Sequence, residues 1–269
     1  MSRCGCTRCA GGRTRDGAAF ERGRPSNQSM LTFGWRRAQE AELDSGRDFA
    51  GFVFRTAPTD SLTIADRQLL FEMFDACFRH ANHPHLEKLL GQLRYVSLAI
   101  RDEKPAGFSV GDVRIMDLPR LGEQTVMLAG LTCVAPEFRR RRLMIELAQR
   151  NVMASTPRGS ERTLFCVRYG HPAAFRSIVA NNRSGVPRRG IRPTAWQQEV
   201  GKVIAGAYGV EGFDPETFVC IGAGTPIGQP IIDFEVEPLD WEVFRHVDRD
   251  RGDSLLGIVW IPDAPPGWA

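Results

Sequence analysis

Beyond residue 50, the hydrophobic positions alternate between the period of a strand and that of a helix. The apolar run at 52–57 predicts a first strand. Residues 59–80 place apolar side chains three and four positions apart, which predicts an amphipathic helix with Asp60 or Ser61 as its N-cap. A second, shorter helix is expected over 85–93.

The middle of the chain predicts a meander of strands followed by a helix, a strand and a helix. The segment 94–118 indicates two strands with a polar hairpin connection, and a longer strand is expected over 124–135. We then expect a helix from Leu143 to about Met153, a strand over 162–169 and a helix over 171–182. Pro172 suits the first position of that last helix.

After residue 182 the periodic pattern weakens, and no internal repeat is visible. The remaining segments predict loop at 183–196, helix at 197–209 and 238–248, and strand at 218–224, 231–236 and 254–261. We therefore divide the chain into a tail, 1–45, a core, 46–182, and a C-terminal extension, 183–269, that completes the sheet and the acceptor side.

The tail differs from the rest in composition, because it is rich in Gly, Arg and Ser and lacks a sustained period. It is expected to be disordered. It holds eight arginines against five acidic residues, an excess equal to the net charge of +3 for the whole chain. The folded part is therefore close to neutral, which gives nucleic-acid binding little support.

Overall composition indicates a soluble globular protein, with 42% hydrophobic and 25% charged residues. No run of 18 apolar residues exists, so no membrane span is expected. The N-terminus lacks the apolar segment of a secretory signal, and a cytoplasmic location is the expectation.

Two clusters of cysteine or histidine residues are of the types that bind metals, but no metal site is predicted at either. Cys4, Cys6 and Cys9 lack a nearby fourth ligand and do not have the spacing of a zinc ribbon. Three histidines lie between the first two helices, where His-Pro punctuation is the commoner explanation: His80, His83 and His85. Four other cysteines are expected to be buried free thiols: Cys77, Cys133, Cys166 and Cys220.

Four consecutive arginines lie where the strand at 124–135 passes into the next helix: Arg139, Arg140, Arg141 and Arg142. The first N–H groups of a helix have no partners within it, and the helix dipole makes that end positive, which favours phosphate. Guanidinium groups add charge-assisted donors. A solvated surface is the commoner reason for an arginine run, but the position of this one favours a phosphate site.

This junction resembles motif A of the GCN5-related N-acetyltransferase (GNAT) superfamily, V-x-P-x-[FY]-[RQ]-x-x-G-x-[GA] followed by a helix. The matching residues are Val134, Pro136, Phe138 and Arg139. The expected order of elements is similar to that superfamily over roughly 50–182. The resemblance implies an α+β (α/β) fold with a central, mixed, mostly antiparallel sheet flanked by helices, here with a C-terminal extension.

Several positions depart from the family pattern. Arg140 and Arg142 replace the glycines of the turn, and Met144 replaces the final small residue. Glycine lets the backbone approach phosphate closely, so these arginines either splay outward and add contacts or weaken coenzyme A binding. At the next helix start His171 replaces an asparagine, and Ile178 stands where the family often has a tyrosine as general acid.

The resemblance implies direct acyl transfer from acetyl-CoA, or another acyl-CoA, to an amine. The pantetheine arm would pair with the backbone of Thr132, Cys133 and Val134, where an N–H near a splay between strands acts as oxyanion donor. Further coenzyme-binding residues are expected in the turn and at the next helix start: Arg139, Arg140, Arg141, Arg142, Leu143, Met144 and His171.

Glu123, at the start of the long strand, is the predicted general base, and Tyr169, at the end of the next strand, is the predicted general acid. Each also has a plain structural interpretation. Glu123 can be a surface carboxylate at a strand end, and Tyr169 can be an aromatic packing residue.

Three alternatives stay open. The first is an inactive or weakly active GNAT-fold protein that senses acyl-CoA. The second is a nucleotide-dependent oxidoreductase, suggested by Gly222, Gly224 and Gly228, although that spacing is one residue too long for the dinucleotide fingerprint. The third is a DNA-binding or interaction module that uses the basic tail.

The acceptor is expected to be a small-molecule or peptide amine entering from the side opposite the coenzyme. The first two helices and the segment after Asn182 would shape that side. Three tryptophans of the extension could wall it or mediate contacts in a homodimer, although core packing is the commoner role: Trp196, Trp241 and Trp260.

Overall fold

The computed structural model describes residues 49–155, 162–180, 182–232 and 235–268. The tail and its three cysteines lie outside the described residues. Within them, eight strands form one sheet in the order β1-β3-β4-β5-β6-β10-β8-β7. Their bounds are β1 (Phe52–Pro58), β3 (Tyr95–Arg101), β4 (Lys104–Leu118), β5 (Gly122–Val134), β6 (Thr163–Tyr169), β7 (Gly212–Asp214), β8 (Val219–Ile221) and β10 (Ser254–Ile261). A small second sheet pairs β2 (Phe78–Arg79) with β9 (Gln229–Pro230).

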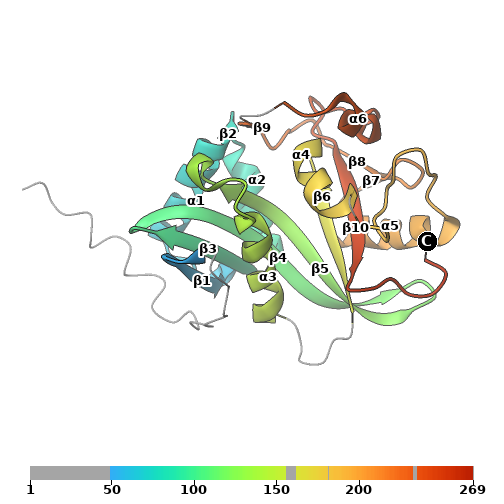
Figure 1. Ribbon diagram of the computed structural model, residues 1–269, viewed down its shortest axis with the longest axis horizontal. Coiled ribbons are helices and arrows are strands. Elements are labelled where there is room, and N and C mark those ends of the chain that lie inside the picture. The colour runs from blue at the N-terminus through green and yellow to red at the C-terminus, as the bar shows by residue number, and fades with distance from the viewer. Residues whose placement is uncertain (1–48, 156–161, 181, 233–234, 269) are drawn as a thin grey trace, which may run out of the picture.

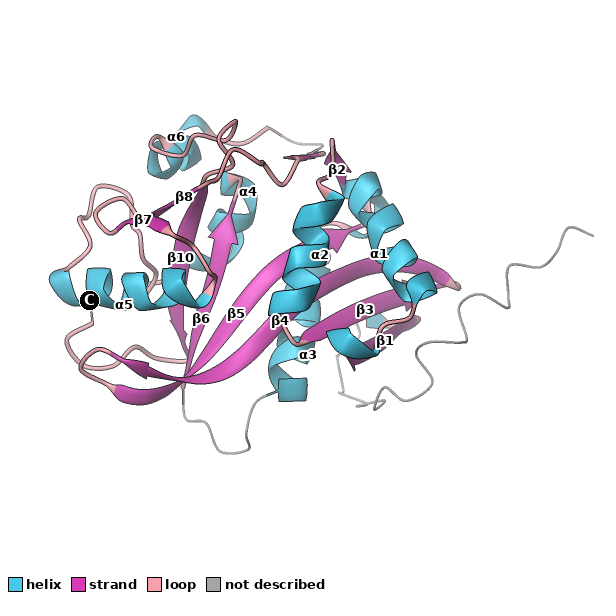
Figure 2. Ribbon diagram, turned by 180° about the vertical axis from the view of Figure 1, so that it is seen from behind, coloured by secondary structure: helices cyan, strands magenta, loops and turns pink. Residues whose placement is uncertain are grey.

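Helices cover both faces of the large sheet (Figures 1 and 2). One face carries α1 (Ile64–Cys77), α2 (His83–Gln92) and α5 (Ala195–Ala207), and the other carries α3 (Leu143–Ser155) and α4 (Pro172–Phe175). The short α6 (Pro238–Trp241) follows β9. Among the described strands only β5 and β6 pair in parallel, so the sheet is mixed and mostly antiparallel, as expected from the resemblance. Among the described helices, none combines the length and hydrophobicity needed to cross a bilayer.

The order of elements in the core also agrees with the expectation. β1, α1, α2, the β3–β4–β5 meander, α3, β6 and α4 follow one another along the chain. The first helix, however, begins later than predicted. Its N-cap is Thr63, not Asp60 or Ser61, because the Thr63 hydroxyl accepts from the Asp66 N–H and the Asp66 carboxylate accepts from the Thr63 N–H. Asp60 and Ser61 belong to a 3-10 turn before it.

The C-terminal extension continues the sheet of the core. β10 lies antiparallel to β6, with Leu255 opposite Tyr169 and Ile261 opposite Thr163. Trp260 and Trp268 are almost completely buried, and Trp196 packs edge-on against Trp268. Two of the three tryptophans named above therefore contribute to packing under the sheet, as the commoner interpretation holds.

Two segments of the extension lack regular structure in their described residues: the glycine-rich segment 222–228 and the segment 231–236. Among the described residues the next helix after Gly222, Gly224 and Gly228 is α6, which begins only at Pro238, so the dinucleotide alternative lacks its phosphate-binding element. The strand predicted over 231–236 is wrong for the described residues, which have no regular structure there. Ile231 makes isolated bonds instead, donating its N–H to Cys77 and accepting at its carbonyl from Arg139.

Candidate functional site

β5 and β6 pair for only part of their length and then separate. The parallel register runs from Thr125 opposite Thr163 to Ala129 opposite Val167, and both strands continue beyond it. We call the point after Ala129 and Val167 the fork; its two arms diverge upward in Figure 1. The expected splay between the two central strands is therefore present.

A β-bulge in β5 begins directly at the fork. Ser109 of β4 lies opposite Thr132 and Gly111 lies opposite Ala129, so Gly130 and Leu131 together face the single residue Val110. A bulge takes a residue out of the ladder and bends the strand. It therefore turns β5 away from β6 at the place where their pairing stops.

Gly130 is required at this bulge by close packing. A Cβ there would lie 2.6 Å from a methyl carbon of Leu93 and 3.1 Å from the Val110 carbonyl oxygen. Carbon atoms do not approach that closely, so either the buried Leu93 side chain or the β5 backbone would have to move. The bulge thus depends on a residue without a side chain.

Beyond the bulge, the N–H and C=O groups of successive β5 residues point alternately toward β4 and away from it. The Ala135 N–H donates to the Ala106 carbonyl at 2.9 Å, so by the alternation of an antiparallel ladder the polar groups of Val134 and Thr132 point away from β4. They face the open side of the fork, where the pantetheine arm was predicted to pair. The Val134 carbonyl accepts from Arg139 Nε at 3.1 Å and from the Cys77 thiol at 3.4 Å.

A row of hydroxyl groups crosses the sheet and ends at Thr132. Thr56, Ser97, Ser109 and Thr132 occupy matching register positions on β1, β3, β4 and β5. Thr56 bonds Ser97 at 2.7 Å, and Ser109 bonds Thr132 at 2.9 Å. Asn151 of α3 joins the row by accepting from Ser97 and donating to the Ser109 carbonyl, and its burial is complete. The row anchors α3 to the strand that leads to the turn.

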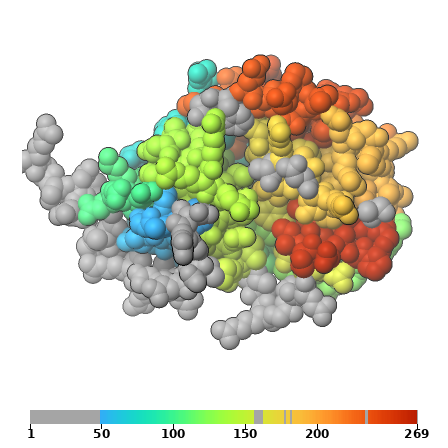
Figure 3. Space-filling model, in the orientation of Figure 1, coloured from blue at the N-terminus to red at the C-terminus, as the bar shows by residue number. Residues whose placement is uncertain are grey.

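The arginine turn keeps the backbone of a glycine turn. Arg140 and Arg142 have φ of 63° and 61°, the left-handed region that favours glycine. Turns with such residues gather N–H groups into anion-binding concavities. The side chains of Arg140, Arg141 and Arg142 are exposed. Figure 3 shows this face, with α3 beside α4.

Arg139 is less exposed than its three neighbours, and its side chain bonds two backbone carbonyls. Its Nε donates to the Val134 carbonyl and its Nη1 donates to the Ile231 carbonyl at 2.7 Å. A hydrogen bond with Cys133, together with the nearby Arg139 charge, lowers the pKa of the Cys77 thiol although burial opposes this. Burial raises the pKa of Cys133. The four predicted arginines are therefore one tether and three exposed cations.

Three other predicted coenzyme residues are placed as follows. The Leu143 side chain is buried against Ala106 and Leu147, so only its backbone can face a ligand. Met144 is partly exposed. His171 caps α4, accepting at Nδ1 from the Ala173 N–H, and burial lowers its pKa to about 4. Its ring packs edge-on against Trp241.

The structure does not bring Glu123 to the fork. Glu123 is exposed, lies opposite Asp117 in the β4–β5 hairpin, and precedes Thr132 by nine residues of strand. At about 3.3 Å per residue, that is roughly 30 Å. Its position fits a surface carboxylate at a strand end.

Tyr169 is at the end of β6 but is enclosed. It is 3% exposed, packs edge-on against Phe175, and its ring lies over Gly257 of β10, where a Cβ would meet Cε2 at 2.6 Å. The hydroxyl is buried without a hydrogen-bond partner in the described structure, and burial raises its pKa. It therefore leans toward β10, on the side of β6 away from β5.

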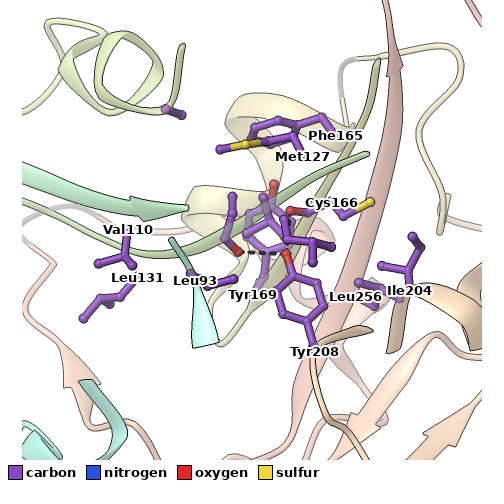
Figure 4. Packing of buried hydrophobic residues seen from close by; sticks show 14 of the residues in the cluster. Leu93, Val110, Met127, Leu131, Phe165, Cys166, Tyr169, Ile204, Tyr208 and Leu256 are labelled. Atoms are coloured by element: carbon purple, nitrogen blue, oxygen red, sulfur yellow. Dashed lines mark hydrogen bonds between the residues drawn. The ribbon is translucent and has the colours of Figure 1, made fainter. Parts of the chain in front are cut away.

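Tyr208 reaches the fork, although sequence reasoning assigned it only to a helix. Its hydroxyl lies 2.8 Å from the Ala129 carbonyl oxygen and 2.7 Å from that of Cys166. Figure 4 shows the ring in the packing beside Cys166, Tyr169 and Leu256. Both partners are backbone atoms far away in sequence, so no residue pattern could have indicated the contact.

The metal alternatives find no support among the described residues, where no group of three or more His, Cys, Asp or Glu could hold an ion. His83 instead bonds Asp75 at 2.8 Å and stacks on Phe71. Burial, with Arg168 and Lys88 nearby, lowers the pKa of His85 to about 4.

No family model and no curated protein matches the chain. Among solved structures, it is similar to an aminoglycoside acetyltransferase from an uncultured soil metagenomic sample, with 19% identity over 43% of this chain and 76% of that chain and a TM-score of 0.31. An aminoglycoside N-acetyltransferase in complex with CoA is 15% identical over 42% and 74%, with a TM-score of 0.32. An integron cassette protein of V. cholerae is 16% identical over 48% and 85%, with a TM-score of 0.34.

Each alignment covers less than half of this chain, and we take the fold from the chain's own geometry. The order of elements, the mixed sheet and the separation of β5 from β6 are those expected from motif A. The described residues therefore form a mixed, mostly antiparallel sheet flanked by helices, the architecture that the resemblance to motif A implies.

Proposed function

We propose that the protein is an acyl-CoA-dependent N-acyltransferase that moves an acyl group, acetyl in the simplest case, from coenzyme A to an amine. The observation that carries this proposal is the fork: a bulge at Gly130 and Leu131 opens β5 and leads directly into the arginine turn. One continuous segment therefore supplies an unpaired strand edge, a bent backbone and a cationic helix start.

The coenzyme would lie along this segment. Thr132 and Val134 offer backbone groups to the pantetheine amides, as an added strand does. The exposed Arg140, Arg141 and Arg142, with the left-handed turn between them, offer charge-assisted donors to the pyrophosphate. Arg139 would hold the end of β5 in place while the other three bind.

The reaction is attack of the amine nitrogen on the thioester carbonyl carbon. The C–S bond breaks as the new C–N bond forms, the ammonium proton leaves to a base or water, and the thiolate takes a proton. A backbone N–H of the bulge would stabilise the oxyanion. Glu123 and Tyr169 remain the proposed base and acid. Because their side chains lie away from the fork, each would have to act through water molecules or after a movement of the strands.

The test of binding is titration calorimetry of the full chain with acetyl-CoA, and with adenosine 3′,5′-bisphosphate as a probe of the phosphate-binding part. We expect micromolar binding of acetyl-CoA that weakens as salt increases, because guanidinium–phosphate contacts are screened. Absence of heat at millimolar ligand would refute the proposal.

The test of chemistry is release of free CoA thiol from acetyl-CoA across a panel of small-molecule and peptide amines. Thiol release that requires both protein and amine, with an acetylated amine detected by mass, supports the enzyme. Tight binding without release for any amine favours the acyl-CoA sensor instead.

A further inference from the structure

The base of the fork raises a problem of backbone hydrogen bonding. Where two parallel strands separate, carbonyl groups that pointed at the neighbouring strand lose their partners, and a buried carbonyl without a partner is costly. Ala129 and Cys166 are the residues at this point; Ala129 is buried and Cys166 is fully buried. Both residues belong to the last pairs of the parallel ladder, so a group that donates to both oxygens would fix the two strands where their pairing ends.

Tyr208 supplies that group. Its hydroxyl is within 2.8 Å of both oxygens, so one phenol proton serves two carbonyls, one on each arm. The side chain is 5% exposed, and its surroundings raise the pKa of the phenol, mainly through burial. The hydroxyl therefore stays protonated and remains a donor.

The C-terminal extension fixes where this hydroxyl lies. Tyr208 is the C-cap of α5, and its N–H donates to the carbonyls of Ile204 and Ala205. Gly209 follows with φ of 66°, a left-handed residue of the kind that ends helices. Val200 and Ile204 of α5 are fully buried, so the helix is held against the sheet. The phenol thus projects from a docked helix into the base of the fork.

We infer that Tyr208 is a positioning residue that sets the separation of β5 and β6, and so places the bulge for the acyl thioester. The inference rests on the proposed function for its link to coenzyme A. Ala129 directly precedes the bulge, so the hydroxyl that binds its carbonyl fixes the start of the segment carrying the oxyanion donor. The extension is then part of the site and does more than cover the acceptor side.

The experiment compares Tyr208→Phe with Tyr95→Phe. Both changes remove one phenol oxygen, but Tyr95 begins β3, two strands from β5, and its ring stacks under Arg94. Hydrogen exchange of the protein without coenzyme gives the first measurement. We expect amides of 126–132 and 164–169 to exchange at least about tenfold faster in Tyr208→Phe, with those of 143–155 unchanged and no such effect in Tyr95→Phe.

Turnover gives the second measurement. A displacement of about 1 Å at a reacting centre can cost roughly a hundredfold in rate, so we expect kcat to fall about ten- to hundredfold. The affinity for acetyl-CoA should change less than about threefold, because the arginine turn is untouched. A purely structural role would instead lower thermal stability and leave kcat of the folded fraction intact.

The two measurements separate the inference from the proposed function. If exchange at the fork is unchanged, or rises equally throughout the chain, the positioning role is refuted whatever the enzyme does. If exchange rises at the fork and kcat of the folded fraction is intact, the link to catalysis is refuted. If wild-type protein neither binds nor consumes acetyl-CoA, the proposed function fails, and faster exchange confined to the fork still supports Tyr208 as the residue that holds the strands apart.

Discussion

The two arms of the fork are built by different means. The β5 arm is shaped by its own sequence, with a glycine at the bulge and a proline and four arginines at the turn, all between Gly130 and Arg142. The β6 arm is shaped by contacts from elsewhere: β10 lies along it, Phe175 covers Tyr169, and Tyr208 bonds its backbone. A motif therefore describes one arm, while the other depends on the whole chain.

The largest expected effect is on the β5 arm, where Gly130→Ala should disrupt the bulge. The added carbon would lie 2.6 Å from Leu93, and overpacking of this kind costs about 1–3 kcal/mol, with further cost from a displaced backbone. We expect a loss of about 3 kcal/mol in the free energy of unfolding, measured by urea denaturation.

Gly91→Ala is the matched control for that change. Gly91 lies in α2 with open space around the position of a Cβ, so alanine should stabilise the helix by up to about 1 kcal/mol. Equal destabilisation by both changes would show that Gly130 has no special role at the bulge.

The next effect tests the difference between Arg139 and the three exposed arginines that follow it. Replacing Arg140, Arg141 and Arg142 together by Gln should weaken acetyl-CoA binding about ten- to thirtyfold and flatten its salt dependence, because exposed charge-assisted contacts are each worth about 1 kcal/mol or less. Calorimetry at two salt concentrations measures both changes.

Arg139→Gln should behave differently. It removes the bonds to Val134 and Ile231, so the expected loss is in thermal stability, with coenzyme affinity reduced as a consequence. Arg188→Gln, at an exposed arginine of the extension, is the control for a simple loss of charge. Indistinguishable behaviour of Arg139 and the other three would contradict the division between them.

A pH-dependent effect tests the burial of His85 in α2. Burial, Arg168 and Lys88 lower the pKa of His85 from 6.5 to about 4, so the unfolded chain binds the proton more tightly than the folded one. Stability is therefore complete above about pH 6.5 and falls as pH decreases toward 4. Each pH unit between these values costs at most about 1.4 kcal/mol, and less for a partly exposed ring.

His85→Gln should remove its share of that dependence, which we expect to be about 1–2 kcal/mol between pH 6.5 and 4.5. His171, whose pKa is also lowered to about 4, provides the comparison, because His171→Gln should remove a separate share. Unfolding free energies at both pH values measure the difference. An unchanged slope in the His85 variant would contradict the burial argument.

The smallest effect is expected at Tyr169. Its hydroxyl is buried without a partner in the described structure, so Tyr169→Phe should change stability by less than about 1 kcal/mol, or improve it. If Tyr169 is only a packing residue, kcat also stays the same. A fall of tenfold or more in kcat at constant stability would instead identify it as the acid.

The sequence predicted most elements of the core because their signals are local. The alternation in 94–118, the apolar stripe after 59 and the proline at 172 each depend on neighbours within a few residues, and the strands and helices follow them. The segment 231–236 was assigned wrongly because its isoleucines indicate a strand, while its described backbone finds only single partners in Cys77 and Arg139.

The part of the site that depends on local sequence could be predicted, and the part that depends on distant contacts could not. The arginine turn follows from motif A, and even the left-handed backbone of its glycines is retained by Arg140 and Arg142. The displacement of Glu123 from the fork depends on strand length and register, and the enclosure of Tyr169 depends on β10. Neither property is encoded near the residue itself.

The tether made by Arg139 has a consequence for any attempt to isolate the core. The Arg139 guanidinium joins the last residue of β5 to the Ile231 carbonyl, which lies 92 positions beyond Arg139 and next to the end of α1. A fragment ending at 182 would keep the bond to Val134 but lose the one to Ile231, and with it the link between this corner and the extension. Shortening the protein there would damage the corner that the cut was meant to preserve.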